Sequence, residues 1–349
     1  MKSIVSLALA LTTILVAHGA AEAAEPKGIH PATPDEISAA IQRGVSWLEK
    51  DMVAWRAKRK CAACHHGPLY LAAIGSAAKS GFSIDAPLRA DMAKWILESP
   101  DSRIFPAQEK SSSGEASGPS KLSLAIAYLS PAIGLLPESN GGGARLRQRI
   151  NDHLLKTQRE DGGWTGPGGR PPLLLNDQQA TQLASSRLDV FESSETQPRG
   201  KADAWLAKQP ADDSHQALIW RIWGDNAPQD PPARKLLARL RELQQPDGGW
   251  RQTEEMASDA FATGQSLQAF ARAQIPASDP AVQRALAFLV RTQAAEGNWP
   301  MVSRPHPENG SRARNLNPIT YAGSAWGVIG LTSYTKIRGK SESSHSAGN

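Results

Sequence analysis

Apolar residues recur at helical spacing in three stretches of the chain, each just before a similar loop. The apolar positions are Leu146, Ile150 and Leu154 in the first stretch, Leu236, Leu237, Leu240 and Leu243 in the second, and Val282, Leu286, Leu289 and Val290 in the third. A stripe of this kind predicts an amphipathic helix. Alternation of β-branched and polar residues is rare, so the pattern does not indicate strands.

The loops that follow these helices share a glutamine at their start and a tryptophan at their end. They read QREDGGW at 158–164, QQPDGGW at 244–250 and QAAEGNW at 293–299. After each loop comes a second segment rich in small residues, which predicts a second helix. The repeated unit is therefore a helix, a Gly-Trp loop and a helix, and such units must pack against neighbours to bury their apolar faces.

Three weaker units complete the chain. They pair 34–55 with 69–80, 87–98 with 120–130, and 200–208 with 213–223. Six hairpins with short links between them predict an all-α protein with an (α/α)6 toroid, in which an inner ring of helices lies inside an outer ring. We expect a single toroid domain over residues 24–335, with the Gln-Trp repeats at 144–335.

The longest loops lie within hairpins, which places them all at one end of the predicted ring. Examples are 99–119, 159–172 and 294–318. Long loops on a rigid scaffold commonly carry the functional site. We therefore expect the site at this end, which we call the mouth.

The Gln-x-x-Asp-Gly-Gly-Trp loops resemble the QW repeats of the squalene–hopene cyclase and protein prenyltransferase superfamily. The resemblance implies the α/α toroid with a central, largely apolar cavity. It also implies a bracing role, rather than a catalytic one, for the loop glutamines and tryptophans, which are Gln158, Trp164, Gln244, Trp250, Gln293 and Trp299.

The catalytic motifs of that superfamily are incomplete in this chain. Squalene–hopene cyclases protonate their substrate with an Asp-x-Asp-Asp-Thr-Ala stretch, which SDAFATG at 258–264 resembles. Asp259 matches the first acid, but Phe261 and Ala262 occupy the acidic positions that follow. A lone carboxylate lacks the partnered acid that strong proton donation needs, so polyene cyclisation is not expected. The zinc site of the protein prenyltransferases is not expected either, because no cysteine follows Cys64.

Asp177 and Asp259 are weak candidates for a catalytic role. Each stands at the start of a predicted inner helix. Such a carboxylate either caps the free backbone amides of the helix or contacts a substrate at the mouth, and the cap is the preferred interpretation.

The first 23 residues have the pattern of a secretory signal peptide. A lysine precedes an apolar run at 4–16, and Ala21-Glu22-Ala23 forms a small-residue cleavage site. We therefore expect a periplasmic or secreted protein that is not an integral membrane protein after cleavage. The polar, Ser-rich tail at 336–349 is expected to be disordered.

The charge balance argues against a nucleic-acid partner. The net charge is +5, but the 39 basic and 34 acidic residues are well mixed along the chain. No basic block stands out that would bind a phosphate backbone.

The only two cysteines lie in one short loop, KRKCAACHHGP at 58–68. Its C-x-x-C-H sequence resembles the attachment motif of c-type cytochromes. On that resemblance, Cys61 and Cys64 bond covalently to the vinyl groups of a haem c, and His65 is the proximal ligand of the iron. A redox-active disulfide, or a zinc or copper site completed by a ligand from elsewhere, are the alternatives.

Three residues are candidates for the distal position on the iron. Met301 and His306 lie in the long loop after Trp299, and His215 begins a predicted inner helix at the mouth. If none of them reaches the iron, the site is open to a small molecule.

The leading hypothesis is an exported c-type haem protein built on an α/α toroid, which transfers electrons or performs haem-dependent redox chemistry at the mouth. Its expected partner is a redox protein. The alternative is a terpenoid cyclase- or prenyltransferase-like toroid that takes up an apolar or isoprenoid molecule, with the cysteine loop holding a metal or a disulfide.

Overall fold

The computed structural model describes residues 30–59, 62, 66–98, 126, 129, 135–136, 142–166, 175–188, 198–224, 230–306 and 309–335. The predicted signal peptide at 1–23, the tail at 336–349 and most of the predicted helix at 120–130 lie outside these residues. So do Cys61, Cys64 and His65.

The described part of the chain is helical and contains no named strand. Its helices are α1 (Pro34–Lys58), α2 (His66–Lys79), α3 (Ala86–Glu98), α5 (Gly142–Thr157), α6 (Asp177–Arg187), α7 (Pro198–Leu206), α8 (His215–Gly224), α9 (Pro231–Glu242), α10 (Ala260–Arg272), α11 (Pro280–Thr292) and α12 (Asn317–Thr332).

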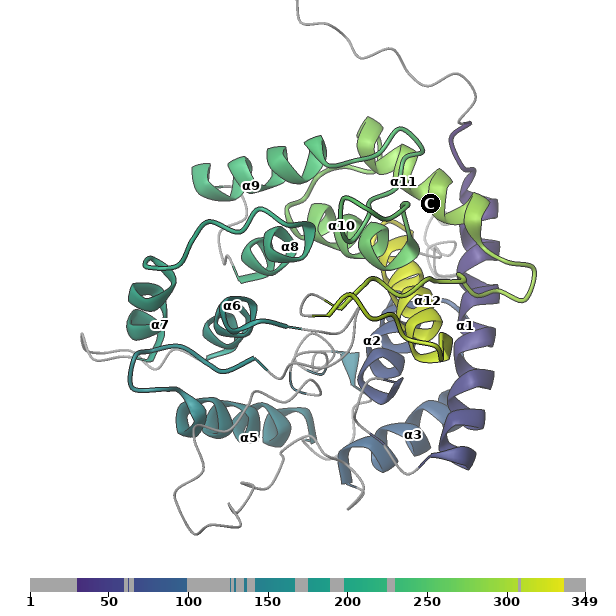
Figure 1. The fold of residues 1–349 in the computed structure, drawn as a ribbon. Helices are drawn as coiled ribbons and strands as arrows, with labels where there is room; N and C mark the ends of the chain where they lie inside the picture. Colours follow the sequence, from purple (N-terminus) through teal and green to yellow (C-terminus); the bar gives the residue numbers. More distant parts are fainter. Residues whose placement is uncertain are drawn as a thin grey trace, which may run out of the picture.

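The helices form two rings, as the repeat pattern predicts. Figure 1 shows α1, α3, α5, α7, α9 and α11 on the outside, around α2, α6, α8, α10 and α12. The ring closes because α1 packs against α2, α11 and α12. This arrangement confirms the all-α toroid.

Proline and capping residues fix where the outer helices begin. Thr33 and Glu36 form a capping box at the start of α1, with Pro34 in its first turn. Asp279 caps α11 by accepting from the amides that follow Pro280. Proline at these positions costs no helical hydrogen bond, because the first amides of a helix have no partner within it.

The inner helices are buried on nearly all sides, and glycines let them approach closely. A Cβ atom on Gly264 of α10 would collide with the backbone carbonyl of Trp326 on α12. Every residue of α12 from Tyr321 to Thr332 is buried. The small residues of the second segments therefore serve close helix packing, which the sequence pattern alone did not explain.

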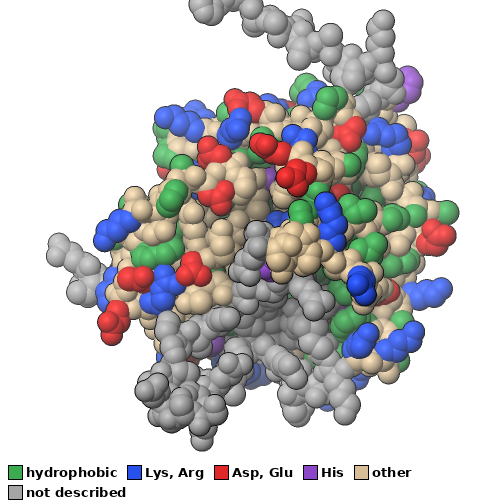
Figure 2. Space-filling model, in the orientation of Figure 1, with side chains coloured by type: hydrophobic (Ala, Val, Ile, Leu, Met, Phe, Trp, Pro, Cys, Tyr) green, Lys and Arg blue, Asp and Glu red, His purple; other side chains and the backbone are tan. Residues whose placement is uncertain are grey.

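Figure 2 shows basic and acidic side chains interspersed on the face in view. Among the described helices, none has both the length and the apolar character to cross a bilayer.

Candidate functional site

The Gln-Trp loops tie three helices together at a time. In the second loop, the Gln244 amide donates to the carbonyls of Gly248 at 2.9 Å and Ala281 at 2.8 Å. The Trp250 indole donates to the Leu240 carbonyl at 2.7 Å, and its backbone amide donates to the Thr263 hydroxyl at 2.9 Å. The loop thus joins α9, α10 and α11.

The other two loops make equivalent bonds to the helices next to them. Gln158 donates to Pro198 of α7 at 2.7 Å, and Gln293 donates to Ala40 of α1 at 2.9 Å. The tryptophan amides donate to Thr181 in the first loop and Ser324 in the third. All three tryptophans are buried. The loops therefore brace the ring, which is the role that the resemblance implies.

Asp177 is not the cap of α6, contrary to the preferred interpretation. The N-cap is Asn176, which accepts from the Gln179 amide at 2.8 Å in a capping box. The Asp177 carboxylate instead accepts from Arg159 at 2.7 Å and from the Gly166 amide at 2.9 Å. These bonds hold the first loop against α6, so the carboxylate already has structural partners.

Asp259 does cap its helix, as predicted. Its carboxylate accepts from the Ala262 amide of α10 and from the Gln252 side chain, both at 2.8 Å. Burial raises the pKa of Asp259 to about 6, and these hydrogen bonds and the charge of Arg304 oppose the rise only in part. The group is a weak acid rather than a strong proton donor.

His215 and Ser266 form a buried pair between α8 and α10. The His215 Nε2 and the Ser266 Oγ are 2.8 Å apart, and the Ser266 hydroxyl donates to the Ala262 carbonyl at 2.9 Å. Because that hydroxyl proton is engaged, the imidazole donates to the serine and does not act as its base. Burial lowers the pKa of His215 to about 3. The pair joins two inner helices and does not form a nucleophile.

Met301 and His306 lie in the loop between α11 and α12. Met301 is buried, and its thioether packs against Gly323 of α12. The His306 backbone bonds to Ser311 and Gly310 within the loop. Their role as distal haem ligands, like that of His215, stays a prediction.

His66, which follows the C-x-x-C-H sequence directly, is enclosed by aromatic rings. It begins α2 and has no exposed surface. Its ring stacks on Trp55 of α1 at a centroid distance of 3.8 Å and on Tyr321 of α12 at 4.0 Å. Its Nε2 lies 3.3 Å from the Asp51 carboxylate. Burial lowers the pKa of His66, although Asp51 and Asn317 oppose this effect. A neutral imidazole here anchors the residue after the motif to the first and last helices.

A cavity of about 220 Å³ lies beside this stack, at the end of α1 that leads into the cysteine loop. Its lining includes the Trp55 ring, two cations (Lys58 and Arg59) and two amides (Asn315 and Asn317). The Arg59 guanidinium also lies over the Trp55 ring, 5.7 Å from its centroid. Within the described residues, no three His, Cys, Asp or Glu side chains gather as a metal site would require. The two cysteines lie outside that part.

The stack around His66 was not found from the sequence. In the sequence, His66 is recognisable only as the second histidine of the cysteine loop. Its stacking partner Tyr321 is on the last helix, far away in sequence. The one usable signal was local, because Asp51 and Trp55 are four residues apart and therefore share a face of α1.

Comparisons with known proteins agree with this architecture. Residues 201–346 match the family described as the Squalene-hopene cyclase C-terminal domain. No curated protein matches the sequence. Among solved structures, a variant of the type II terpene cyclase MstE from Scytonema, in complex with its product merosterolic acid A, is 14% identical with a TM-score of 0.52. A second variant, in complex with the substrate geranylgeranyl dihydroxybenzoate, is 13% identical with a TM-score of 0.50.

Each of these comparisons covers 86% of this chain and 97% of the other. At this level of identity the likeness concerns the fold alone. The chain therefore has the α/α-toroid fold of the type II terpene cyclases, and its C-terminal part is similar to the corresponding domain of squalene-hopene cyclase.

Proposed function

We propose that this protein binds an extended apolar molecule of the isoprenoid class within its ring and does not cyclise it by protonation. The observation that carries the proposal is Phe261, which stands where the superfamily has an acid. Its ring centroid lies 6.4 Å from that of Trp326. An aromatic side chain at this position favours binding of a hydrocarbon and removes the proton donor.

Phe261 belongs to an aromatic cluster that joins three inner helices. Trp223 of α8 lies 5.0 Å from Trp326 of α12 and 5.0 Å from Trp220, measured between ring centroids. Aromatic rings offer large apolar surfaces with a fixed shape, which suits a hydrocarbon ligand. The MstE complexes, which contain a geranylgeranyl substrate and its product, support the same ligand class for this chain.

The remaining carboxyl group is poorly suited to protonate an alkene. Asp259 accepts hydrogen bonds from Ala262 and Gln252. Its pKa of about 6 describes a weaker acid than an ordinary aspartic acid. No second carboxyl group follows at 261 or 262 to increase its acidity.

Binding and turnover can be measured separately. Geranylgeraniol is titrated against the full-length protein by native mass spectrometry, and the mixture is then extracted and analysed for cyclic products by gas chromatography. We expect a complex and unchanged ligand. Trp326→Ala should weaken binding about tenfold, whereas the matched control Trp95→Ala on outer helix α3 should not.

Absence of a complex, or equal binding by both variants, would overturn the binding proposal. A cyclic hydrocarbon product would overturn the claim that the ring does not cyclise its ligand.

A second function, covalent attachment of haem c, rests on the loop at 58–68 and the cavity beside it. The described residues suit the edge of a porphyrin. Lys58 and Arg59 offer positive charge for the propionates, and Asp51 is the one acid in the lining. Cys61 and Cys64 would attach the group, and His65 would hold its iron. When bound, the haem would supply one-electron transfer to a redox partner protein in the periplasm or outside the cell.

Intact mass after expression with c-type haem maturation tests this second function. We expect the mass of one haem on the exported protein and a Soret band that survives acid–acetone extraction. Both should vanish in Cys61→Ala/Cys64→Ala. A mass without haem, whether it carries a metal ion or a disulfide, would overturn the haem proposal without touching the isoprenoid proposal.

A further inference from the structure

The Gln-Trp loops define equivalent positions on three outer helices. In each loop the glutamine amide donates to one carbonyl of the next outer helix, and the loop glycine with positive φ faces a second carbonyl three residues later. The two carbonyls belong to Pro198 and Lys201 on α7, to Ala281 and Arg284 on α11, and to Ala40 and Arg43 on α1. The three helices can therefore be compared residue by residue.

Two core positions on these helices are charged only on α7. On α11, Val282 lies one residue and Leu286 five residues after Ala281. On α1, Ile41 and Val45 lie at the same distances after Ala40. All four are buried aliphatic side chains. The equivalent residues on α7 are Arg199 and Asp203, and Ala202 is the single buried residue of this helix.

The inner helix α6, which packs against α7, also has polar residues where the other inner helices have small or aliphatic ones. The hydroxyl residue that accepts from the loop tryptophan is Thr181 on α6, Thr263 on α10 and Ser324 on α12. The next residue is Gln182 on α6 but Gly264 and Ala325 on the other two. Four residues after the hydroxyl residue, α6 has Ser185, whereas α10 has Leu267 and α12 has Val328.

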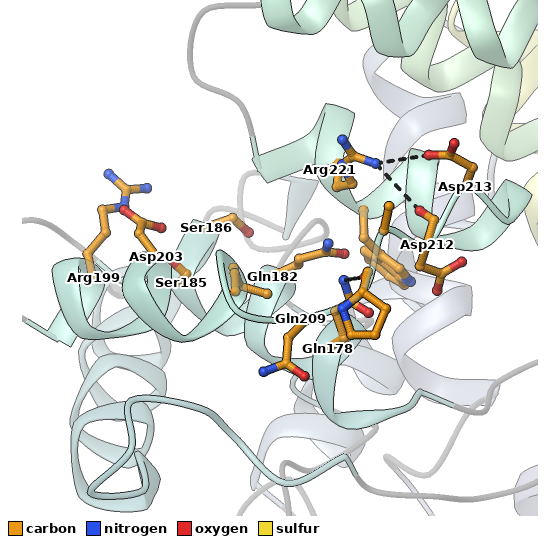
Figure 3. A pocket seen from close by; sticks show the side chains of 14 residues that line it. Gln178, Gln182, Ser185, Ser186, Arg199, Asp203, Gln209, Asp212, Asp213 and Arg221 are labelled. Carbon is orange, nitrogen blue, oxygen red and sulfur yellow. Dashed lines mark hydrogen bonds and ion pairs between the residues drawn. The ribbon is translucent and has the colours of Figure 1, made fainter.

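A cavity of about 670 Å³ occupies this altered junction between α6, α7 and α8. Figure 3 shows Gln182 in the middle of its lining, between Ser186 on one side and the Asp212, Asp213 and Arg221 group on the other. At the equivalent junction of α10 and α12, glycines bring the backbones into contact instead. The polar residues thus line an open space that the other repeats fill.

The charges of the lining largely balance. Arg221 donates to the Asp213 carboxylate at 3.4 Å and to the Asp212 carbonyl at 3.5 Å. Arg199 and Asp203 have opposite charges one turn apart on α7. Such a lining does not favour an ion of either sign. Amides and hydroxyls, in contrast, both donate and accept hydrogen bonds, as the hydroxyls of a sugar do.

One lining amide has an acceptor without a partner. The Oε1 of Gln182 is buried, and no hydrogen-bond donor among the described residues reaches it. Its neighbour Gln178 donates to the Pro210 carbonyl at 3.2 Å, which holds the loop after α7 over the cavity. A buried acceptor without a donor costs stability, and the Gln182 side chain lies among the polar groups of the cavity lining.

We propose that this cavity binds an uncharged polyhydroxylated molecule, such as a short oligosaccharide. Local departures from the pattern of a fold are expected at functional or strained sites, and this junction departs from the other repeats. The volume falls within the range of small-molecule sites, but the lining is far more polar than is usual for them. The cavity adjoins the aromatic cluster, because Trp220 lines the cavity and also packs against Trp223.

Saturation-transfer NMR with a fixed panel of probes tests the proposal. The panel contains maltotriose, cellotriose, xylotriose and chitotriose as uncharged oligosaccharides, triglycine as a zwitterion and inorganic phosphate as an anion. We expect at least one oligosaccharide to bind, and neither charged probe. Arg199→Val/Asp203→Leu, which restores the residues of the other repeats, should raise the melting temperature and abolish binding. Gln182→Leu should weaken binding about tenfold, because it removes the amide with little change in volume.

Lys208→Ala, on the exposed turn after α7, is the matched control and should bind as the unmodified protein does. The proposal is overturned if no oligosaccharide in the panel binds, if triglycine or phosphate binds instead, or if Arg199→Val/Asp203→Leu binds unchanged. Gln182→Leu keeps the test decisive should the double variant fail to fold.

Discussion

The side-chain amide of Gln293 donates to the backbone carbonyl of Ala40 at 2.9 Å across 253 positions of sequence. The bond joins the last Gln-Trp loop to the first helix of the toroid. The Arg43 guanidinium donates in return to the Gln293 Oε1 at 2.6 Å. The other two Gln-Trp loops brace neighbouring hairpins, and the equivalent bond in this loop closes the ring.

We predict that Gln293→Ala will loosen α1 more than any other helix. The change removes bonds to Ala40 and Gly297 and leaves their carbonyls without this donor, at a cost of about 1–3 kcal/mol. Hydrogen exchange should accelerate in α1. Gln283→Ala is the control, because the Gln283 amide reaches only Ala277, six residues away. Equal exchange in both variants would show that the ring closes without this bond.

We predict that Gly248→Ala will destabilise the protein severely. Gly248 has a φ of +89°, and a Cβ atom there would lie 2.5 Å from the Arg284 carbonyl of α11. Strain and collision act together, so a loss of more than about 3 kcal/mol is expected. Gly310 has a φ of +67° but nothing within 4 Å of a Cβ atom, and Gly310→Ala should cost only about 1 kcal/mol. Denaturant titration compares the two, and similar losses would mean that backbone strain alone decides the outcome.

We predict that Asp259 and His215 will give opposite pH dependences of stability. Asp259 has a pKa of about 6, above that of an unfolded aspartate, so its contribution to stability is lost as the pH rises through 6. His215 has a pKa of about 3, below that of an unfolded histidine, so its contribution is lost as the pH falls from 6.5 towards 3. In the intact protein the two effects partly cancel between pH 4 and 6.

Single substitutions separate them. Asp259→Asn keeps a capping side chain and should make stability rise more steeply with pH between 4 and 6. His215→Gln should make stability fall with rising pH over the same range. Urea unfolding at pH 4, 5, 6 and 7 measures both slopes, and parallel curves for the two variants would contradict the assignment.

The fold could be predicted because the helix–loop–helix pattern that produces it is repeated in the sequence. Each of the three Gln-Trp loops carries the residues that brace it, so spacing alone identified the hairpins around Trp164, Trp250 and Trp299. The cap of α6 was misassigned by one residue. Both Asn176 and Asp177 can cap a helix, but only Asn176 has a glutamine three residues later, Gln179, to complete a capping box.

The sites were harder to predict because they depend on contacts distant in sequence. His66 is enclosed by Tyr321 of the last helix, and no local pattern reveals that pairing. The polar junction was visible in principle, since Arg199 and Asp203 replace aliphatic residues of the other repeats. Recognising it required the register of α7, which the bond from Gln158 to Pro198 supplies.

The aromatic stack around His66 leads to a last prediction. His66→Phe keeps a ring between Trp55 and Tyr321 and loses the polar contacts with Asp51 and Asn317. A loss of about 1 kcal/mol is expected. His66→Ala removes the ring from a closed space and should cost about 2–5 kcal/mol. Thermal unfolding of the two variants tests whether stacking or the polar contacts dominate. Equal losses would assign the stability to the contacts with Asp51 and Asn317 rather than to stacking.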